Sequence, residues 1–403
     1  MTAATRAPSA PATMRAAQTL QTLQTLQTLQ IGMSWFQEDP GGLNRVYASV
    51  IEELVRAGVE VHGLVVGSSD VARLSGGTVA AFAPQSAALV TRMNALRVES
   101  LRWLRPRPGA VVVSHFAQNV FPLLGQLGDH PLVVHFQGPW GQESRAEGAA
   151  PWTVLAKELI ERAVYSRADR CIVLSQAFGE ILATQFGVPR ERIHVIPGGV
   201  EVDRFALTPS RASCRVALGW PADRPIVLCV RRLIRRVGID ALIAASVALR
   251  ERVPDALVLI AGRGPLQAEL EAQIAALGLG DTVRLLGFVA DEMLPMAYRA
   301  ADLSVVPTAS LEGFGLITVE SLAAGTPCVV TPVGGLSDVI APLAPQLVTA
   351  SVSHADIADT LANALSGAIP LPTATECTSY ARQHFDWPVI AARVRDVYEL
   401  ARR

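Results

Sequence analysis

The sequence predicts an α/β protein built from two doubly wound parallel sheets. Short apolar segments alternate with longer amphipathic segments along the chain, and this alternation pauses once near the middle and then restarts. Such alternation is typical of parallel sheets covered by helices on both faces. The chain has 403 residues, of which 50% are hydrophobic. It is therefore longer than a typical single domain and has enough apolar residues to form two hydrophobic cores.

The first series of expected strands begins after residue 30. These strands are short apolar runs, as strands buried on both faces are, and they cover residues 31–35, 61–66, 110–113, 132–134, 171–174 and 194–196. Amphipathic segments between them are expected to be helices, for example 43–57, which Gly58 closes, and 154–166.

The second series follows a polar segment, residues 200–209, which we interpret as the hinge. Its expected strands cover residues 225–230, 256–260, 283–286, 303–306, 328–330 and 347–349, and a terminal helix is expected from residue 387 onward. Because ligands of open α/β sheets bind at the carboxyl ends of the strands, we expect a cleft where these ends of the two sheets face each other.

Composition argues against several classes of protein. Lys plus Arg number 35 and Asp plus Glu number 36, so the overall charge gives no reason to expect nucleic-acid binding. The five cysteines are scattered without CxxC spacing, which indicates reduced core residues of a cytoplasmic protein rather than a zinc site or disulfides. No apolar run approaches the roughly 18–20 residues that span a bilayer.

The N-terminal segment differs in composition from the rest. Residues 18–30 repeat the triplet Gln-Thr-Leu, and no long apolar core or cleavage site precedes them. We interpret residues 1–29 as a low-complexity, disordered extension and assign them no function.

The segment 311–320, with the sequence Leu-Glu-Gly-Phe-Gly-Leu-Ile-Thr-Val-Glu, carries the main functional signal. Its glycines leave backbone N–H groups open just before an apolar segment of helical period, where the positive end of the helix favours a diphosphate or sugar oxygens. Glu312 on the loop is positioned to accept hydrogen bonds from a sugar ring, and Glu320, in the helix, from a ribose diol. Each charge-assisted bond of this kind contributes roughly 1.5–3 kcal/mol.

This decapeptide resembles the Glu-x7-Glu signature of glycosyltransferase family 4, and the resemblance extends from residue 31 to the C-terminus. The family implies the GT-B architecture of two facing Rossmann-like domains. It also implies that residues 313–316 (Gly313, Phe314, Gly315 and Leu316) bind the donor. The expected domains are residues 30–203 for the acceptor and 204–387 for the donor, with the last helix, 388–403, returning to the first domain.

Two further loops match the family pattern. Gly41 and Gly42 lie between the first strand and the first helix, where the family contributes a Gly-Gly loop to the donor diphosphate across the cleft; alone, the pair would indicate only a tight turn. Gly262 and Gly264 follow the second strand of the second domain. The family places such loops on the nucleotide, and backbone atoms at the position of Val289 on the base.

The loop 231–240 resembles the Arg-Leu-x4-Gly loop of the family, in which Arg232 would neutralise the donor diphosphate. The lysine usual in this loop is absent, and Val237 occupies its position. Either Arg236 or Arg235 supplies the second positive charge, or that charge is missing. Arginine binds phosphate through two N–H groups, whereas lysine is a single charge, so replacement by a neighbour is chemically feasible.

His115 and His135 both follow apolar strands. A histidine in this position is more often structural than catalytic, but the family carries a histidine at the end of the strand that holds His135, close to the transferred sugar. We therefore predict that His135 donates a hydrogen bond there and keep His115 as an acceptor-side candidate.

Residues 92–105 mix arginines with apolar residues at helical spacing. For this segment, a helix packed on the sheet with a solvated basic face is favoured over a helix on a membrane surface.

The resemblance implies a glycosyltransferase that retains the anomeric configuration, and the absence of an Asp-x-Asp motif in a loop next to a strand predicts that it needs no metal ion. We expect the protein to be cytoplasmic, with at most peripheral membrane contact. The donor would be a UDP-, GDP- or ADP-linked sugar and the acceptor a glycan, a lipid-linked compound or a small molecule. No cofactor is expected. The alternatives are a GT-B nucleotide-sugar epimerase or phosphorylase, or a catalytically silent nucleotide-sugar scaffold, which the absent lysine would favour. A glycoside hydrolase that uses Glu312 and Glu320 is disfavoured by their place on a loop and helix start suited to diphosphate.

Overall fold

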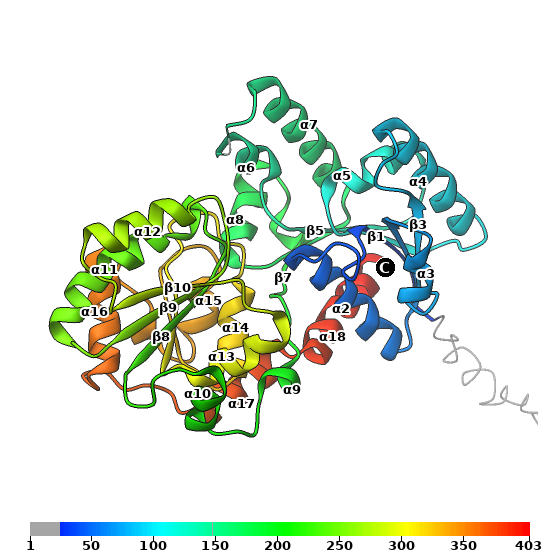
Figure 1. Cartoon of the computed structure of the whole chain (residues 1–403). Coiled ribbons are helices and arrows are strands. Elements are labelled where there is room, and N and C mark those ends of the chain that lie inside the picture. Colours follow the sequence, from blue (N-terminus) through cyan, green and yellow to red (C-terminus); the bar gives the residue numbers. More distant parts are fainter. Residues whose placement is uncertain (1–24, 147) are drawn as a thin grey trace, which may run out of the picture.

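A computed structural model of the protein describes residues 25–146 and 148–403 (Figure 1). The predicted N-terminal extension therefore lies mostly outside the described residues. Within them the chain forms two parallel sheets of seven and five strands, each flanked by helices, which confirms the predicted α/β class. None of the described helices combines the length and the apolar character needed to cross a membrane.

The first sheet has the strand order β3-β2-β1-β4-β5-β6-β7, with all neighbours parallel. Its strands are β1 (Gln27–Ser34), β2 (Glu60–Val66), β3 (Val79–Ala83), β4 (Val111–Ser114), β5 (Leu132–Phe136), β6 (Arg170–Val173) and β7 (Ile193–Val195). The helices of this part are α2 (Gly42–Arg56), α3 (Asp70–Leu74), α4 (Leu89–Leu104), α5 (Ala117–Val120), η1 (Phe121–Gln126), α6 (Trp140–Ala146), α7 (Pro151–Arg167), α8 (Gln176–Gln185) and η2 (Arg190–Arg192).

The second sheet has the order β10-β9-β8-β11-β12, again parallel throughout. Its strands are β8 (Ile226–Val230), β9 (Leu257–Ala261), β10 (Val283–Gly287), β11 (Leu303–Val306) and β12 (Cys328–Val330). The helices that follow the linker are α9 (Val202–Phe205), α10 (Arg211–Leu218), η3 (Arg235–Val237), α11 (Ile239–Arg252), α12 (Gln267–Ala276), η4 (Asp291–Met293), α13 (Leu294–Ala300), α14 (Leu316–Ala323), α15 (Leu336–Ile340), η5 (Pro345–Leu347), α16 (His354–Leu365), α17 (Ala374–Phe385) and α18 (Trp387–Ala401).

The first sheet departs from the sequence-based expectation at its start and at its edge. Strand β1 begins at Gln27, so the last triplet of the repeat belongs to the sheet and not to the extension. Leu29 is fully buried, and residues 27–31 pair with β2 on one side and, from Thr28, with β4 on the other, which explains why this copy of the repeat is ordered. Strand β3 was not expected, because its sequence, Val-Ala-Ala-Phe-Ala, is rich in alanine, a poor strand former.

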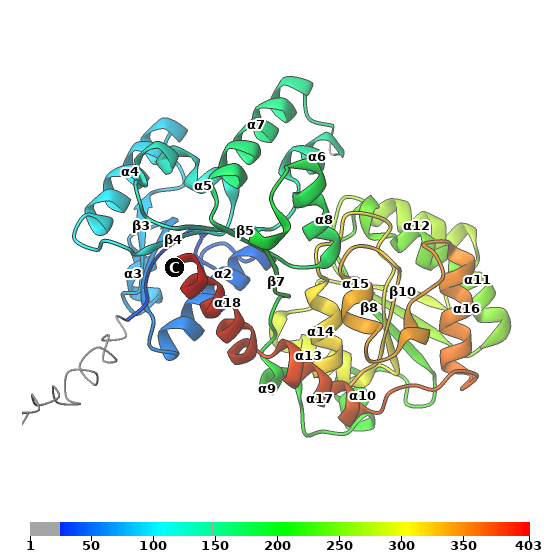
Figure 2. The ribbon, with the colours of Figure 1, turned by 180° about the vertical axis from the view of Figure 1, so that it is seen from behind.

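Helices cover the two faces of the first sheet with separate apolar clusters. On one face, α4, η1, α7 and α8 bury residues such as Leu96, Leu123 and Val164 against the strands. On the other face, α2 and the last helix, α18, bury Val50 and Val394. Figure 2 shows α18, near the C-terminus, beside α2, the first helix that follows β1.

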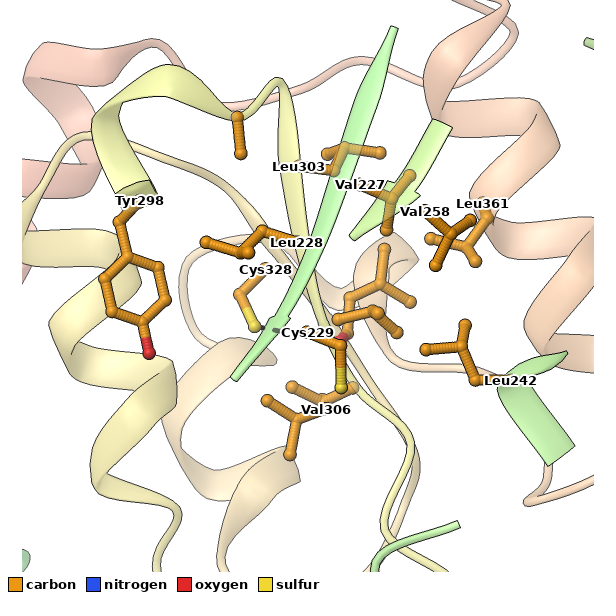
Figure 3. Packing of buried hydrophobic residues seen from close by; sticks show 14 of the residues in the cluster. Val227, Leu228, Cys229, Leu242, Val258, Tyr298, Leu303, Val306, Cys328 and Leu361 are labelled. Carbon is orange, nitrogen blue, oxygen red and sulfur yellow. Dashed lines mark hydrogen bonds between the residues drawn. The ribbon is translucent and has the colours of Figure 1, made fainter. Parts of the chain in front are cut away.

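The second sheet lies in the middle of the larger apolar cluster. Val227, Leu228 and Val258 from the central strands meet Leu361 and Tyr298 from the surrounding helices (Figure 3). Cys229 and Cys328 are part of this packing, and burial raises the pKa of each thiol to about 12, so they remain protonated core residues. The expected strand at 347–349 is reduced to a single bridge between Val330 and Val348.

The connection back to the first sheet depends on a glycine. Val200, at the end of the first part, forms an isolated bridge with Asp386, immediately before α18. A Cβ atom on the neighbouring Gly199 would lie 2.5 Å from ring atoms of Trp387, which is closer than real Cβ contacts allow. Glycine at this position therefore lets the first residue of α18 pack against the linker.

Candidate active site

A cleft of about 1090 Å³ lies between the two sheets. Its walls come from loops that follow β1 and β5 in the first sheet and β8, β9, β10 and β11 in the second, which is where parallel sheets bind ligands. Twelve of the residues predicted from the sequence line it: Gly41, Gly42, Arg232, Arg236, Gly262, Val289, Glu312, Gly313, Phe314, Gly315, Leu316 and Glu320. His115, His135 and Gly264 do not.

The loop before α14 has a backbone that its glycines make possible. Gly315 has φ 79° and caps α14 without any side-chain hydrogen bond, so the first N–H groups of this helix are not occupied by a capping side chain. The turn at Gly334 lies so close that a Cβ atom there would be 1.6 Å from the carbonyl oxygen of Glu312. This contact fixes the backbone from which Glu312 extends.

Glu312 is held by two side chains of the second sheet. Arg231 Nη2 lies 2.7 Å from Glu312 Oε2, and the hydroxyl of Thr308 lies 3.4 Å from the same oxygen. The side chains of Arg231 and Glu312 are 11% and 13% exposed, so this pair is largely shielded from solvent. Arg231, which sequence reasoning passed over in favour of its neighbour, therefore determines where the Glu312 carboxylate points.

Glu320 lies deeper, on the helix. Tyr298 Oη donates a hydrogen bond of 3.4 Å to Glu320 Oε2. Burial raises the pKa of Glu320, and Asp291 acts in the same direction, while Arg45, Arg204 and the bond from Tyr298 lower it in part. The carboxylate therefore lies in a pocket with cationic groups nearby, and its oxygens have room for the hydroxyl groups of a ligand.

The arginine loop borders the same cleft. Arg232 and Arg236 are both exposed to the cleft, and Arg236 Nη1 donates 2.7 Å to the carbonyl oxygen of Leu311, next to Glu312. Val237, at the position of the usual family lysine, is 2% exposed and packs in the core of the second sheet. Arg235 pairs with Glu269 on the outer surface instead. Of the two arginines considered as a replacement, only Arg236 is therefore at the cleft.

Opposite this loop, α2 begins at the paired glycines. Gly41 is extended, and no side chain caps the helix. A Cβ atom on Gly42 would lie 4.0 Å from Leu316, the first residue of α14. The N-termini of α2 and α14, one from each domain, thus lie close together at the cleft, and the partial positive charges of both helix ends favour an anion beside them.

An ion triplet crosses the cleft beside Glu320. Asp291 Oδ2 lies 2.7 Å from Arg45 Nη2 of α2 and 2.8 Å from Arg204 Nη2 of α9. Burial tends to raise the pKa of Asp291, but the hydrogen bonds and charges of the two arginines outweigh it, and the pKa is lowered. Nothing in the sequence pattern indicated this contact, because Arg45 and Asp291 are 246 residues apart.

The two predicted histidines lie behind the cleft. His135 Nε2 is 2.9 Å from Tyr398 Oη of α18, and its ring stacks on His115 with 4.3 Å between centroids. His115 Nε2 in turn is 2.9 Å from Gln30 Oε1. Both are almost fully buried, and burial lowers the pKa of His135 to about 3. The predicted role of His135 beside the transferred sugar does not fit this placement, because its ring is directed toward the last helix.

Gln137, two residues later, has the placement expected of that histidine. It lines the cleft, and its Nε2 is buried with no acceptor among the described atoms of the protein. A buried amide without a partner is costly, which favours a ligand oxygen as its acceptor.

Gly264, the third predicted residue that does not line the cleft, has a structural role. A Cβ atom there would lie 2.3 Å from the carbonyl oxygen of Leu233.

The buried histidines predict acid sensitivity. An exposed histidine has a pKa near 6.5, whereas that of folded His135 is about 3. Between these values the unfolded chain binds the extra proton, so the free energy of unfolding should fall as the pH drops, by about 2.7 kcal/mol from His135 at pH 4.5. Thermal unfolding at pH 7 and 4.5 should show a smaller loss for His135→Gln than for the wild type. His354→Gln, on the exposed start of α16, should lose as much as the wild type, and equal losses in all three proteins would contradict the assignment.

Comparison with known proteins agrees with this geometry. Residues 40–204 match the family described as Glycosyltransferase Family 4, and residues 210–384 match the family described as Glycosyl transferases group 1. The chain is 36% identical over 224 residues to a D-inositol 3-phosphate glycosyltransferase of Nocardia farcinica, covering 54% of this chain and 49% of that protein. It is 35% identical over 184 residues to a mannosylfructose-phosphate synthase of Agrobacterium fabrum, covering 44% and 40%. The matched regions thus span about half the length of these curated relatives or less.

Solved structures share the fold along nearly the whole chain. Anabaena Alr3699/HepE in complex with UDP superposes with a TM-score of 0.75 at 20% identity, covering 93% of this chain and 100% of that chain. Sucrose-phosphate synthase from Thermosynechococcus elongatus gives a TM-score of 0.72 at 23% identity, covering 93% and 98%. At this identity the likeness establishes the architecture only. With both halves matched by glycosyltransferase families and the two facing sheets shared with these structures, the chain belongs to glycosyltransferase family 4 and has the GT-B fold.

Proposed function

We propose that the protein transfers a sugar from a nucleoside diphosphate sugar to a hydroxyl acceptor with retention of anomeric configuration. The observation that carries this proposal is the arrangement of charge in the cleft. Two helix N-termini and two arginines, Arg232 and Arg236, surround a space for the diphosphate, and the carboxylates of Glu312 and Glu320 border it from the Gly-Phe-Gly loop and from α14.

The two carboxylates would bind different parts of the donor. Glu320, in its pocket beside Tyr298, would accept hydrogen bonds from the ribose hydroxyls, and backbone atoms at Val289 would contact the base. Glu312, held by Arg231 and Thr308, would accept hydrogen bonds from the sugar ring. Gly262, which has φ 145° and would clash with the carbonyl oxygen of Arg231 if it carried a Cβ, lets the nucleotide loop approach the arginine loop.

Charge on the departing diphosphate would be stabilised by Arg232, by Arg236 and by the helix ends, without a metal ion. Gln137 would donate its free amide N–H to a sugar or phosphate oxygen, the role that the sequence suggested for His135. Because Glu312 is engaged with Arg231, we assign no side-chain nucleophile. The acceptor hydroxyl would instead attack the anomeric carbon from the face that the diphosphate leaves. The new C–O bond would form as the bond to the diphosphate breaks, and the hydroxyl proton would pass to a departing phosphate oxygen, which gives retention.

The names of two relatives, a D-inositol 3-phosphate glycosyltransferase and a mannosylfructose-phosphate synthase, support a small sugar-like or cyclitol acceptor. A place in polysaccharide or glycoconjugate synthesis remains a prediction. The five free and buried cysteines support a reducing, cytoplasmic environment. The domain boundaries at residues 203/204 and 387/388 remain predictions.

The test is a transfer assay with the full chain. Thermal shift with UDP, GDP and ADP should identify the base, because a ligand at 100 times its dissociation constant stabilises a protein by about 2.7 kcal/mol. Transfer from the matching sugar donor should then release the nucleotide only when an acceptor is present, and the product should keep the donor's anomeric configuration by proton NMR. Turnover without an acceptor would favour an epimerase, turnover that requires phosphate a phosphorylase, and binding without any turnover a silent scaffold.

The division of roles gives a separate prediction. Glu320→Ala should weaken nucleotide binding measured by calorimetry about tenfold or more, because it removes a charge-assisted contact to ribose worth roughly 1.5–3 kcal/mol. Glu251→Ala, on the exposed side of α11, is the matched control and should bind as the wild type does. Unchanged nucleotide affinity in Glu320→Ala would contradict the ribose assignment.

A further inference from the structure

One flank of the first domain exposes an unusual number of large apolar side chains. They come from three neighbouring elements, α4, η1 and α7, and we refer to this flank as the α4–α7 face. Its apolar members are Leu89, Val90, Val98, Phe121, Trp152, Leu155 and Leu159. Trp152 is 75% exposed and Val90 is 68% exposed. Side chains packed at the edge of a core would be much less exposed than this.

On α7 these residues form a stripe. Trp152, Leu155 and Leu159 follow each other at spacings of three and four and therefore lie on one side of the helix. The opposite side of α7 buries Val164 and Tyr165 in the cluster against the first sheet. The exposed stripe therefore points away from the protein, where nothing in the described chain covers it.

Helix α4 presents a mixed basic and apolar side in the same direction. Its buried residues, Leu96 and Leu104, belong to the same cluster as those of α7, so both helices cover the same face of the sheet and their outer sides both point away from it. Helix η1 packs between them, and the two helices lie along one edge of the domain in both views (Figures 1 and 2).

The basic part of this face is not neutralised. A hollow of about 650 Å³ on α4 is lined by Arg97, Arg102 and Arg105 together with Asn94, Val98, Leu101 and Gln126. Within residues 25–146 and 148–403, none of these three arginines forms an ion pair, and Arg97 contacts only the amide oxygen of Gln126, at 3.4 Å. Glu99 of α4 lies between Arg97 and Arg102 in sequence but forms no ion pair with them in the part of the chain that the structure describes. On α7, Glu158 is engaged with Arg145.

We propose that the α4–α7 face binds the surface of an anionic lipid bilayer. Exposed aliphatic side chains, a tryptophan and adjacent unpaired arginines are the combination that such a surface favours: apolar groups enter the headgroup boundary, and arginines meet the lipid phosphates. The sequence alone favoured a solvated basic face on 92–105. The stripe on α7 changes this interpretation, because it adds an apolar contact that a merely solvated face does not need.

The face is coupled to the acceptor side of the cleft. Buried Glu161 of α7 accepts hydrogen bonds from the backbone N–H groups of Trp140 and Gly141, at 2.9 and 3.0 Å, and so anchors the start of α6. Gln137 and Gly138, just before α6, line the cleft. Docking through α7 would therefore hold the rim of the cleft next to the bilayer, where a lipid-linked acceptor is present.

The test is co-sedimentation of the full chain with vesicles. The wild type should sediment with vesicles of equal parts phosphatidylglycerol and phosphatidylcholine but not with phosphatidylcholine alone, and 0.5 M NaCl should weaken binding. Arg97→Glu/Arg102→Glu and Trp152→Ser/Leu155→Ser should each lower the partition coefficient at least about tenfold. Val216→Ser/Leu277→Ser, which changes exposed apolar residues of the second domain, is the matched control and should bind as the wild type does.

Three results would overturn the proposal: no binding to anionic vesicles, equal binding by the two face variants and the control, or a wild-type dimer in light scattering that Trp152→Ser/Leu155→Ser converts to a monomer without any vesicle binding. The last would assign the face to a second copy of the chain. Nucleotide binding by each face variant should match that of the wild type, which shows that the variants are folded and keeps this outcome separate from that of the transferase assay.

Discussion

Arg232→Ala is expected to lower kcat/KM about 100-fold or more. Its side chain is exposed and lines the cleft that the start of α2 also borders, and removing one preorganised donor to a developing oxyanion typically costs about 3–4 kcal/mol in transition-state stabilisation. Arg235→Ala is the matched control, since Arg235 belongs to the same loop but pairs with Glu269 at the surface. A wild-type rate in Arg232→Ala would refute the diphosphate role of this loop.

Arg236→Ala decides whether the absent lysine has been replaced. If Arg236 supplies the second charge, its removal should cost a similar factor, and Val237→Lys should not accelerate transfer. Val237 is 2% exposed within the core of the second sheet, so a lysine there also carries a desolvation cost and should lower the melting temperature. A silent Arg236→Ala together with a faster Val237→Lys would instead show that the second charge is missing in this protein.

Glu312→Gln is the second change with a large expected effect. It keeps an acceptor for the hydroxyl of Thr308 but removes the charge that faces Arg231, so both turnover and folding should suffer. We expect kcat to fall about 100-fold and the free energy of unfolding to fall by up to about 3 kcal/mol, because Arg231 is left largely buried without a counter-charge and its Nε already has no partner.

A double-mutant cycle separates the two effects. Arg231→Met removes the stranded charge, so Arg231→Met/Glu312→Gln should regain much of the stability that Glu312→Gln loses. Turnover should stay low in the double variant, since the carboxylate that would bind the sugar is still absent. If turnover returned together with stability, Glu312 would serve only to balance Arg231.

The sequence pattern predicted strands well where the signal was strong. Buried runs of Val, Ile and Leu placed β2, β4, β5 and β8 within one or two residues, since strands covered on both faces have few alternatives. It failed at β3, where alanine dilutes the signal, and at Gln27, where one copy of a repeat is ordered only because its leucine is buried by distant strands. Neither outcome could be read from local composition.

For the site, the glycines and charged residues in loops showed which segments line the cleft. The sequence did not show in which direction individual side chains point. The Gly-Phe-Gly loop needs its glycines, because Gly315 has φ 79° and a Cβ atom on Gly313 would lie 2.8 Å from the ring of Phe178. The Gly-Gly turn also lines the cleft, where its glycines leave the space before α2 open. The sequence could not show that His135 is directed at Tyr398 of the last helix while Gln137 reaches the cleft. It also could not show that Arg45 meets Asp291, because that contact depends on how the two domains face each other.

The return of α18 to the first sheet also constrains the order in which the protein is made. The 15 residues of α18 bury Trp387, Val394 and Tyr398 against strands that are synthesised some 250 residues earlier. While the ribosome is still producing the second domain, that face of the first sheet stays open and apolar. The second domain, which is continuous in sequence, can finish folding first, and the first domain is completed only when the last helix leaves the ribosome. In this protein the half that is translated first is therefore the half that matures last.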